Sequence, residues 1–253
     1  MTSKVIDLSD KFAANTQSFP GEVSDPAGLL YGIQKAYGKE ARKQSHAAYK
    51  TLITAHALLA GVIMRAMRRA NRLITEVTTI NEERNALFAC YIIGMTTCEK
   101  AIEQARYLQA FALLRQEMET VAHLKTMKND KRRKSKPDVF DSSIKRLYEN
   151  LSTAVHASNS YIMRNFTSDD VSDASLGTLA GTRYFPMCDC ETARRAFGLH
   201  LILTLEFITE LRVDHSEIEG GEFTQDDINA LSHANRLLID EGILDSDTWL
   251  ESF

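Results

Sequence analysis

Apolar residues recur every three or four positions along most of the chain, and this period predicts amphipathic α-helices. A short first helix is expected over residues 26–37, with Pro26 in its first turn. The clearest stripe follows over residues 39–79 and predicts a helix that packs against a neighbour. Its apolar positions are Leu52, Ala55, Leu59, Val62, Ala66, Ala70, Leu73, Val77 and Ile80.

A second helical region is expected over residues 81–127, as one long helix or as two helices joined near Thr96-Thr97. Its apolar positions are Leu87, Tyr91, Gly94, Cys98, Ala101, Ala105 and Leu108, followed by Phe111, Leu114, Met118 and Val121. A third helix is predicted from about Asp138 to Phe166, directly after Pro137.

The C-terminal part of the chain contains the most apolar segment. Residues 189–213 are apolar nearly all round, which is typical of a helix buried in the middle of a fold. Residues 167–187 are rich in Ser, Asp, Gly and Thr and predict a long flexible loop. A last helix is expected after Thr224, whose Thr-Gln-Asp-Asp text resembles a capping box, and Gly242 is a plausible stop.

No strand-like alternation competes with these helices. The pattern therefore predicts an all-α fold: a single antiparallel helical-bundle domain over residues 26–253, preceded by an N-terminal arm over residues 1–25. The regular stripe from Leu52 to Ile80 also predicts self-association, with a homodimer as the expected oligomer.

Composition places the chain among soluble globular proteins. Its 253 residues are 44% hydrophobic and 25% charged. No uninterrupted apolar run approaches the roughly 18 residues that span a bilayer, and the first residues lack the apolar core of a secretory signal. We therefore expect a cytoplasmic protein with no membrane partner.

The four cysteines are expected to be reduced thiols in such a compartment. Cys90 and Cys98 lie in apolar helical text, where cysteine acts as a small hydrophobic residue. Cys188 and Cys190 could form half of a metal site, but a second cysteine pair is missing from the sequence, so a loop-to-helix junction is the favoured interpretation. We expect no metal and no cofactor.

The net charge of −4 conceals a division along the chain. Residues 1–204 contain 28 basic and 21 acidic residues, a balance of +7, whereas residues 205–253 contain 2 basic and 13 acidic residues, a balance of −11. The densest basic stretch is a predicted loop over residues 125–137. Its cluster Lys131, Arg132, Arg133 and Lys134 could bind a nucleic-acid backbone, or it could face the acidic C-terminal part over residues 205–253.

Two polar rows stand beside the apolar stripes. Arg115 and Glu119 lie four residues apart on the second helical region, and Tyr148, Ser152 and His156 share a face of the third. If these helices are antiparallel neighbours, the rows meet in a polar pocket where His156 could act as an acid or base. The alternative is an ordinary exposed ion pair and a row of half-buried residues bonded to backbone or water.

The text Arg115-x3-Glu119 followed by Tyr148-x2-Leu151-Ser152-x3-His156 resembles a pattern in bacterial helical-bundle families of uncharacterised function. These families are similar to the broader HEPN-like helical proteins, several of which act in toxin–antitoxin or phage-defence systems. The resemblance covers roughly residues 85–165. It implies a ligand-binding or catalytic pocket formed by these five polar residues.

Active HEPN ribonucleases carry an R-x4–6-H motif whose Arg and His act on the scissile phosphate without metal. Arg195 and His200 match its spacing, but the residue after the arginine is Ala196 where the motif has a polar residue. Since the surrounding text is very apolar, a buried core histidine is the favoured interpretation of His200.

Three functions remain open at this point. The leading one is a binding or association module of HEPN-like type, in stress or phage defence, with RNA or protein partners. The second is a metal-independent ribonuclease that uses Arg195 with His200, or Arg115 with His156. The third is a bundle that binds a small ligand in its interior.

Overall fold

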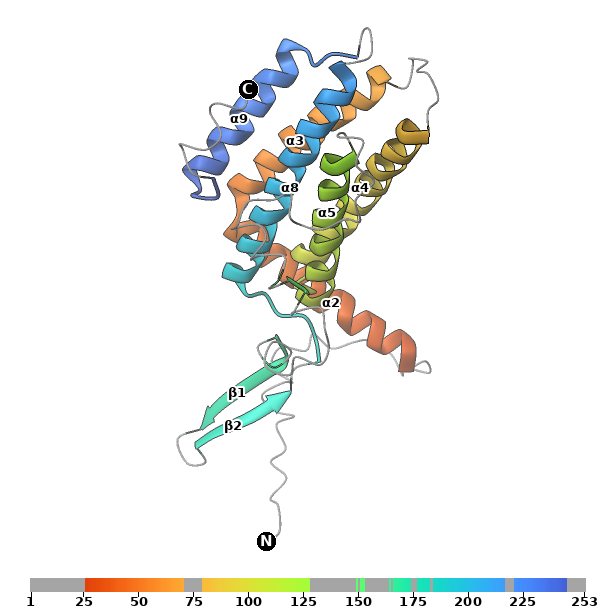
Figure 1. Cartoon of the computed structure of the whole chain (residues 1–253). Coiled ribbons are helices and arrows are strands. Elements are labelled where there is room, and N and C mark those ends of the chain that lie inside the picture. Colours follow the sequence, from red (N-terminus) through yellow and green to blue (C-terminus); the bar gives the residue numbers. More distant parts are fainter. Residues whose placement is uncertain are drawn as a thin grey trace.

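A computed structural model describes residues 26–70, 79–127, 149, 151–152, 164, 166–173, 177–182, 184–216 and 221–244. In these ranges the chain forms six helices and one two-stranded hairpin (Figure 1). The helices are α2 (Pro26–Ala48), α3 (Lys50–Ala70), α4 (Thr79–Glu103), α5 (Tyr107–Met127), α8 (Cys190–Ser216) and α9 (Gln225–Asp240). The predicted helical bundle is confirmed.

Helix α8 is the central element of the bundle. It packs against α5, α3, α4 and α2, so most of its length is surrounded (Figure 1). Its buried positions lie on every side of the helix from Ala193 to Leu211, as the nearly continuous apolar text predicted. Burying a whole helix in this way gives the other helices a common apolar surface to pack on.

Helix α3 lies between α8 and α9 and carries the stripe seen in the sequence. Leu52, Ala55, Leu59, Val62 and Ala66 are all buried, which confirms the first part of that stripe. Ile80, at the end of the predicted stripe, is instead 38% exposed on α4.

The N-terminus of α9 is held to α3 by one buried carboxylate. Asp227 completes a capping box with Thr224, as the sequence predicted, and accepts hydrogen bonds of 2.7 Å from both Arg65 and Arg69 of α3. The helix ends before Gly242, whose positive φ of 65° is the left-handed conformation common after a helix C-terminus.

The second helical region is two helices, but their junction is not at Thr96-Thr97. The chain turns at residues 104–106, where Ala105 has a φ of 54° and the amide of Arg106 donates to the carbonyl of Ala101. The right-handed helix α4 thus ends at a residue in the left-handed conformation, and this residue is alanine where glycine is usual. Because alanine is also the strongest helix former, nothing in the local sequence marks the break.

The predicted loop over residues 167–187 is in part wrong. Strands β1 (Ser168–Asp173) and β2 (Gly177–Thr182) form an antiparallel hairpin beyond the end of the bundle at which α8 begins (Figure 1). A strand is recognised in a sequence by its alternating apolar residues. These two strands are polar and are held together by backbone hydrogen bonds, so that signal is missing. The predicted basic loop over residues 125–137 also begins too early, because α5 continues to Met127.

Several predicted segments lie outside the described residues. They include the N-terminal arm, most of the third helix, the basic stretch after Met127 and the chain after residue 244. Of the third helix, Leu151 is buried and Ser152 is half-buried, both in helical conformation.

Helix α3 is the one described helix that is long and apolar enough, by length and composition, to cross a membrane. Its mean hydropathy is high enough for a membrane-spanning helix, although its sequence has no uninterrupted apolar run of about 18 residues. Its apolar face packs in the bundle and its Arg65 pairs with Asp227, and core helices of bundle proteins pass the same test.

Candidate functional site

Arg115 and Glu119 form the predicted i,i+4 pair on α5. The guanidinium Nε lies 3.0 Å from Oε1 of Glu119, and the two side chains are 29% and 41% exposed. The pair is thus partly solvated. Tyr148 and His156 lie outside the described residues, so their meeting with this pair stays a prediction. The basic cluster Lys131, Arg132, Arg133 and Lys134, predicted to bind nucleic acid, also lies outside them.

Arg195 and His200 lie on the same helix and point to different surroundings. The Arg195 side chain is 76% exposed and pairs with Glu191 one turn away at 2.6 Å. His200 is completely buried. Residues five apart on a helix are separated by about 140° around its axis, so the structure does not bring these two together.

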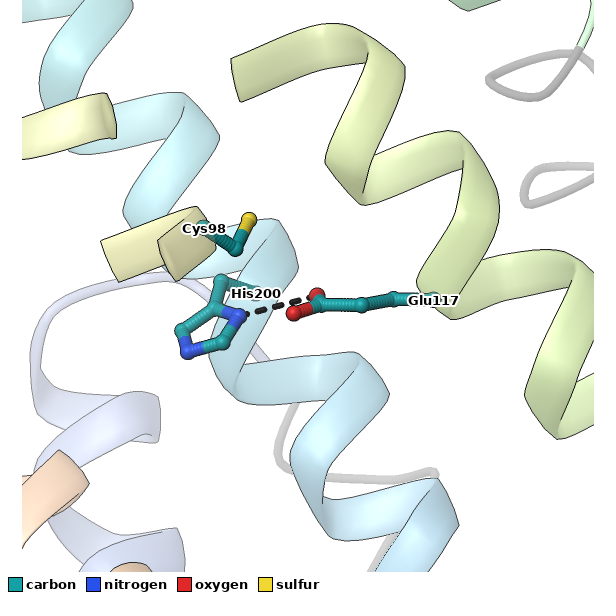
Figure 2. Close-up of side chains that lie close together, drawn as sticks. All are labelled: Cys98, Glu117 and His200. Carbon is teal, nitrogen blue, oxygen red and sulfur yellow. Dashed lines mark hydrogen bonds and ion pairs between the residues drawn. The ribbon is translucent and has the colours of Figure 1, made fainter. Parts of the chain in front are cut away.

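His200 instead belongs to a buried polar cluster with Cys98 and Glu117 (Figure 2). The three residues come from α8, α4 and α5, and all three are buried. The Nδ1 atom of His200 lies 2.9 Å from Oε2 of Glu117. One ligand-type atom from each side chain lies within 4.8 Å of the other two.

The pKa values of Cys98 and His200 in this cluster are shifted from their ordinary values. Burial and the nearby Glu117 carboxylate raise the pKa of the Cys98 thiol well above its usual value. Burial alone would lower the pKa of His200, but the charge and hydrogen bond of Glu117 outweigh it and the pKa is raised. The cluster therefore favours an imidazolium–carboxylate pair beside a neutral thiol.

Two polar atoms of the cluster are left without a hydrogen-bond partner: Oε1 of Glu117 and Nε2 of His200. The outer side of the His200 ring faces His56 of α3, with 5.4 Å between ring centroids. Burial and the charge of His200 lower the pKa of His56 to about 4, so His56 is neutral near pH 7. A buried group with unmet hydrogen-bonding capacity calls for an explanation, because it costs about 1–3 kcal/mol.

The backbone and side chains around the cluster are held firmly. The Thr204 hydroxyl donates to the carbonyl of His200 at 2.8 Å and lies 3.2 Å from the Tyr91 hydroxyl. Tyr91 in turn stacks on Phe207, with ring centroids 4.1 Å apart. These contacts fix α4 against α8 at the level of the cluster.

A small surface hollow between α4 and α5 has one member of this cluster, Glu117, in its lining. Glu117 and Tyr91 line it together with residues nearer to solvent, including Gly94 and Thr120. A Cβ atom at Gly94 would meet nothing within 4 Å, which shows how open this side of α4 is. Glu117 is therefore the one residue of the cluster that lines this hollow.

The sequence contained a signal for this cluster that pattern reading missed. Glu117 lies three residues after Leu114 and four before Val121, so it stands within the apolar stripe of α5. The Arg115–Glu119 spacing does not point to it. Cys98 is buried as expected, whereas Cys90, expected in the same role, is exposed.

Cys188 and Cys190 lie at the loop-to-helix junction before α8. Their sulfur atoms are 3.7 Å apart, and the thiol of Cys188 lies 3.4 Å from the Ser45 hydroxyl. Among the described residues, the Cys98 cluster is the only group of three or more potential metal-ligating side chains.

A second feature is the N-terminal half of α2, which extends past the end of the bundle (Figure 1). Leu30 is 47% exposed and Tyr31 is 68% exposed. The C-terminal half is different, because Ala41 and Ser45 are buried against the bundle. Only Lys35 is charged between Pro26 and Gly38.

Comparisons with protein-family models, curated proteins and solved structures found no match to this chain. The HEPN-like resemblance therefore depends on the short motifs in the sequence alone.

Proposed function

We propose that this protein is an association module that forms a homodimer through the N-terminal half of α2, residues 26–38. The single observation that carries the proposal is this projecting, nearly uncharged half-helix with its exposed Leu30 and Tyr31. Charge depletion combined with exposed tyrosine and leucine is typical of the core of protein interfaces.

The half-helix is also poorly stabilised by itself. Gly28 and Gly32 each cost about 1 kcal/mol relative to alanine in a helix interior. Isolated helices shorter than about 12–15 residues are marginal in water. A partner helix would cover the exposed side chains of Leu30 and Tyr31.

A second copy of the same chain fits this surface better than a charged partner. In a two-fold dimer each face meets its own copy, so charges on the face would be brought near charges of the same sign. Lys35 is the one charged residue in this half, which keeps that repulsion small. In the HEPN-like setting that the motifs imply, the dimer would act as a binding module in stress or phage defence.

The experiment is sedimentation equilibrium of the full chain over a wide concentration range. We expect a dimer for the unchanged protein and a monomer for the double variant Leu30→Glu/Tyr31→Glu, with the same helical circular dichroism. Met64→Glu is the matched control, because Met64 is an exposed apolar residue on a different helix, at 52%. A monomer at all concentrations, or a double variant that still dimerises, would overturn the proposal.

A further inference from the structure

We propose that Cys98, Glu117 and His200 bind one divalent transition-metal ion of the zinc type inside the bundle. This site goes beyond the association function and is independent of it. It also departs from the sequence-based expectation of no metal, which considered the cysteines and histidines only along the chain.

The ligand types are those that zinc prefers. A thiolate, an imidazole nitrogen and a carboxylate oxygen are all common zinc ligands, with bonds of about 2.0–2.3 Å. In a tetrahedral site such ligands lie about 3.3–3.8 Å from one another. The three atoms here already lie within 4.8 Å of one another, so small side-chain movements would complete the geometry.

The arrangement of the side chains also favours a shared ion. In Figure 2 the sulfur of Cys98 and the carboxylate of Glu117 lie on the side of the ring where Nδ1 of His200 is found. A metal at this point would take the place of the hydrogen on Nδ1. The unpartnered Oε1 of Glu117, in a residue that is 4% exposed, would then have a cation beside it.

Charge is balanced with and without the ion. In the metal-free cluster the imidazolium and the carboxylate cancel, and the thiol is neutral. When a divalent ion binds, the thiol and the imidazolium each release one proton to solvent. The thiolate and carboxylate then neutralise the two positive charges, so no net charge is buried in either state.

Three protein ligands leave a fourth position for water or another small molecule, as in catalytic rather than structural zinc sites. The hollow lined by Gly94 and Glu117 brings the surface of the bundle close to one of the three ligands. The hydrogen bond from Thr204 to the His200 carbonyl holds the imidazole-bearing turn of α8 in place.

The test uses the full chain with Cys188→Ser and Cys190→Ser, which removes the other candidate cysteine pair. The protein is freed of metal with a chelator and titrated with Zn²⁺ by calorimetry and with Co²⁺ by absorption spectroscopy. We expect one ion per chain and a thiolate-to-cobalt charge-transfer band. Cys98→Ser should abolish that band, and Glu117→Gln should weaken Zn²⁺ binding at least about tenfold.

Cys90→Ser is the matched control, since Cys90 is an exposed cysteine on the same helix and should leave binding unchanged. Circular dichroism in the presence of chelator shows whether each variant is folded. If Cys98→Ser is unfolded, the folded Glu117→Gln variant decides the outcome. Absence of stoichiometric Zn²⁺ binding, or a charge-transfer band that survives Cys98→Ser and disappears with Cys90→Ser, would overturn the proposal.

Discussion

The same three helices meet in two buried polar groups, and these groups differ in how well their hydrogen bonds are satisfied. At one level Arg84 of α4 donates to Asp214 of α8 and to the carbonyl of Leu124 in α5, so all three guanidinium nitrogens have partners, and the one unbonded atom there is Oε2 of Glu210, 3.6 Å from Arg84. At the other level are Cys98, Glu117 and His200, where two buried atoms have none. Along α4 and α8 the two levels are 14 residues apart, or about 21 Å.

This difference separates a structural role from a functional one. Buried ions that are fully paired fasten helices together, and breaking one pair is costly because the other charge is left behind. A buried group with unmet bonds adds little stability as it stands. Such a group is better explained by a ligand that it binds.

Replacing Arg84 with methionine should destabilise the protein by about 3 kcal/mol. The substitution leaves the Leu124 carbonyl without its donor, and Asp214 and the nearby Glu210 without a counter-charge. Urea denaturation followed by circular dichroism measures the change in the free energy of unfolding. Arg195→Met is the control: its exposed pair with Glu191 should be worth no more than about 0.5 kcal/mol. Equal effects of the two substitutions would contradict the prediction.

Asp227→Asn should cost about 2 kcal/mol at pH 7, because the charge between Arg65 and Arg69 is lost. The arginines are partly solvated, which makes the effect smaller than at Arg84. Burial alone would raise the pKa of Asp227, but hydrogen bonds from Arg65 and Thr224 and the charge of Arg69 lower it below its ordinary value of 3.8.

A lowered pKa in the folded state determines the sign of the pH dependence. The unfolded chain binds the proton first as the pH falls, so the contribution of Asp227 is complete above about pH 4 and is lost below it. Urea denaturation between pH 7 and pH 3 should therefore show the gap between the unchanged protein and Asp227→Asn closing at the acid end. A gap of constant size would show that the charge does not carry the effect.

The smallest change is expected when the incompletely bonded cluster is made apolar. In the presence of chelator, the double variant Glu117→Leu/His200→Phe should unfold within about 1 kcal/mol of the unchanged protein, because both partners are replaced together. Glu117→Leu alone should cost about 2 kcal/mol, since it leaves the buried His200 without its acceptor. If the double variant lost as much stability as Arg84→Met, the cluster would stabilise the packing of the helices as Arg84 does, and the proposed difference between the two groups would be wrong.

Periodicity predicted the helices well where one apolar face was decisive. The stripe of α3, the buried α8 and the capped start of α9 at Thr224 all follow from residues within one helix. The junction between α4 and α5 did not follow, because Ala105 adopts a left-handed conformation that its own preferences disfavour. The hairpin did not follow either, since its pairing joins residues on two separate strands.

In the candidate site, too, contacts within one helix could be predicted and contacts between helices could not. The spacing of Arg115 and Glu119 on one helix was readable, and their ion pair is present. Glu117, between them, was not singled out, although its place in the apolar stripe marked it as buried. His200 was expected to be a core histidine and is buried, but its partners Cys98 and Glu117 are about 100 and 80 residues away in sequence, respectively.

The sequence by itself determined that most of the described chain is helical, which faces are apolar and that α8 is the buried centre, but it did not place the break between α2 and α3 at Tyr49. These properties depend on neighbours within one or two turns, which the order of residues records directly. Only the tertiary structure decided that a thiol, a carboxylate and an imidazole from three helices share one buried point, and that the start of α2 projects from the bundle. Those facts depend on how helices pack, and packing is set by many contacts between distant residues that no single stretch of sequence contains.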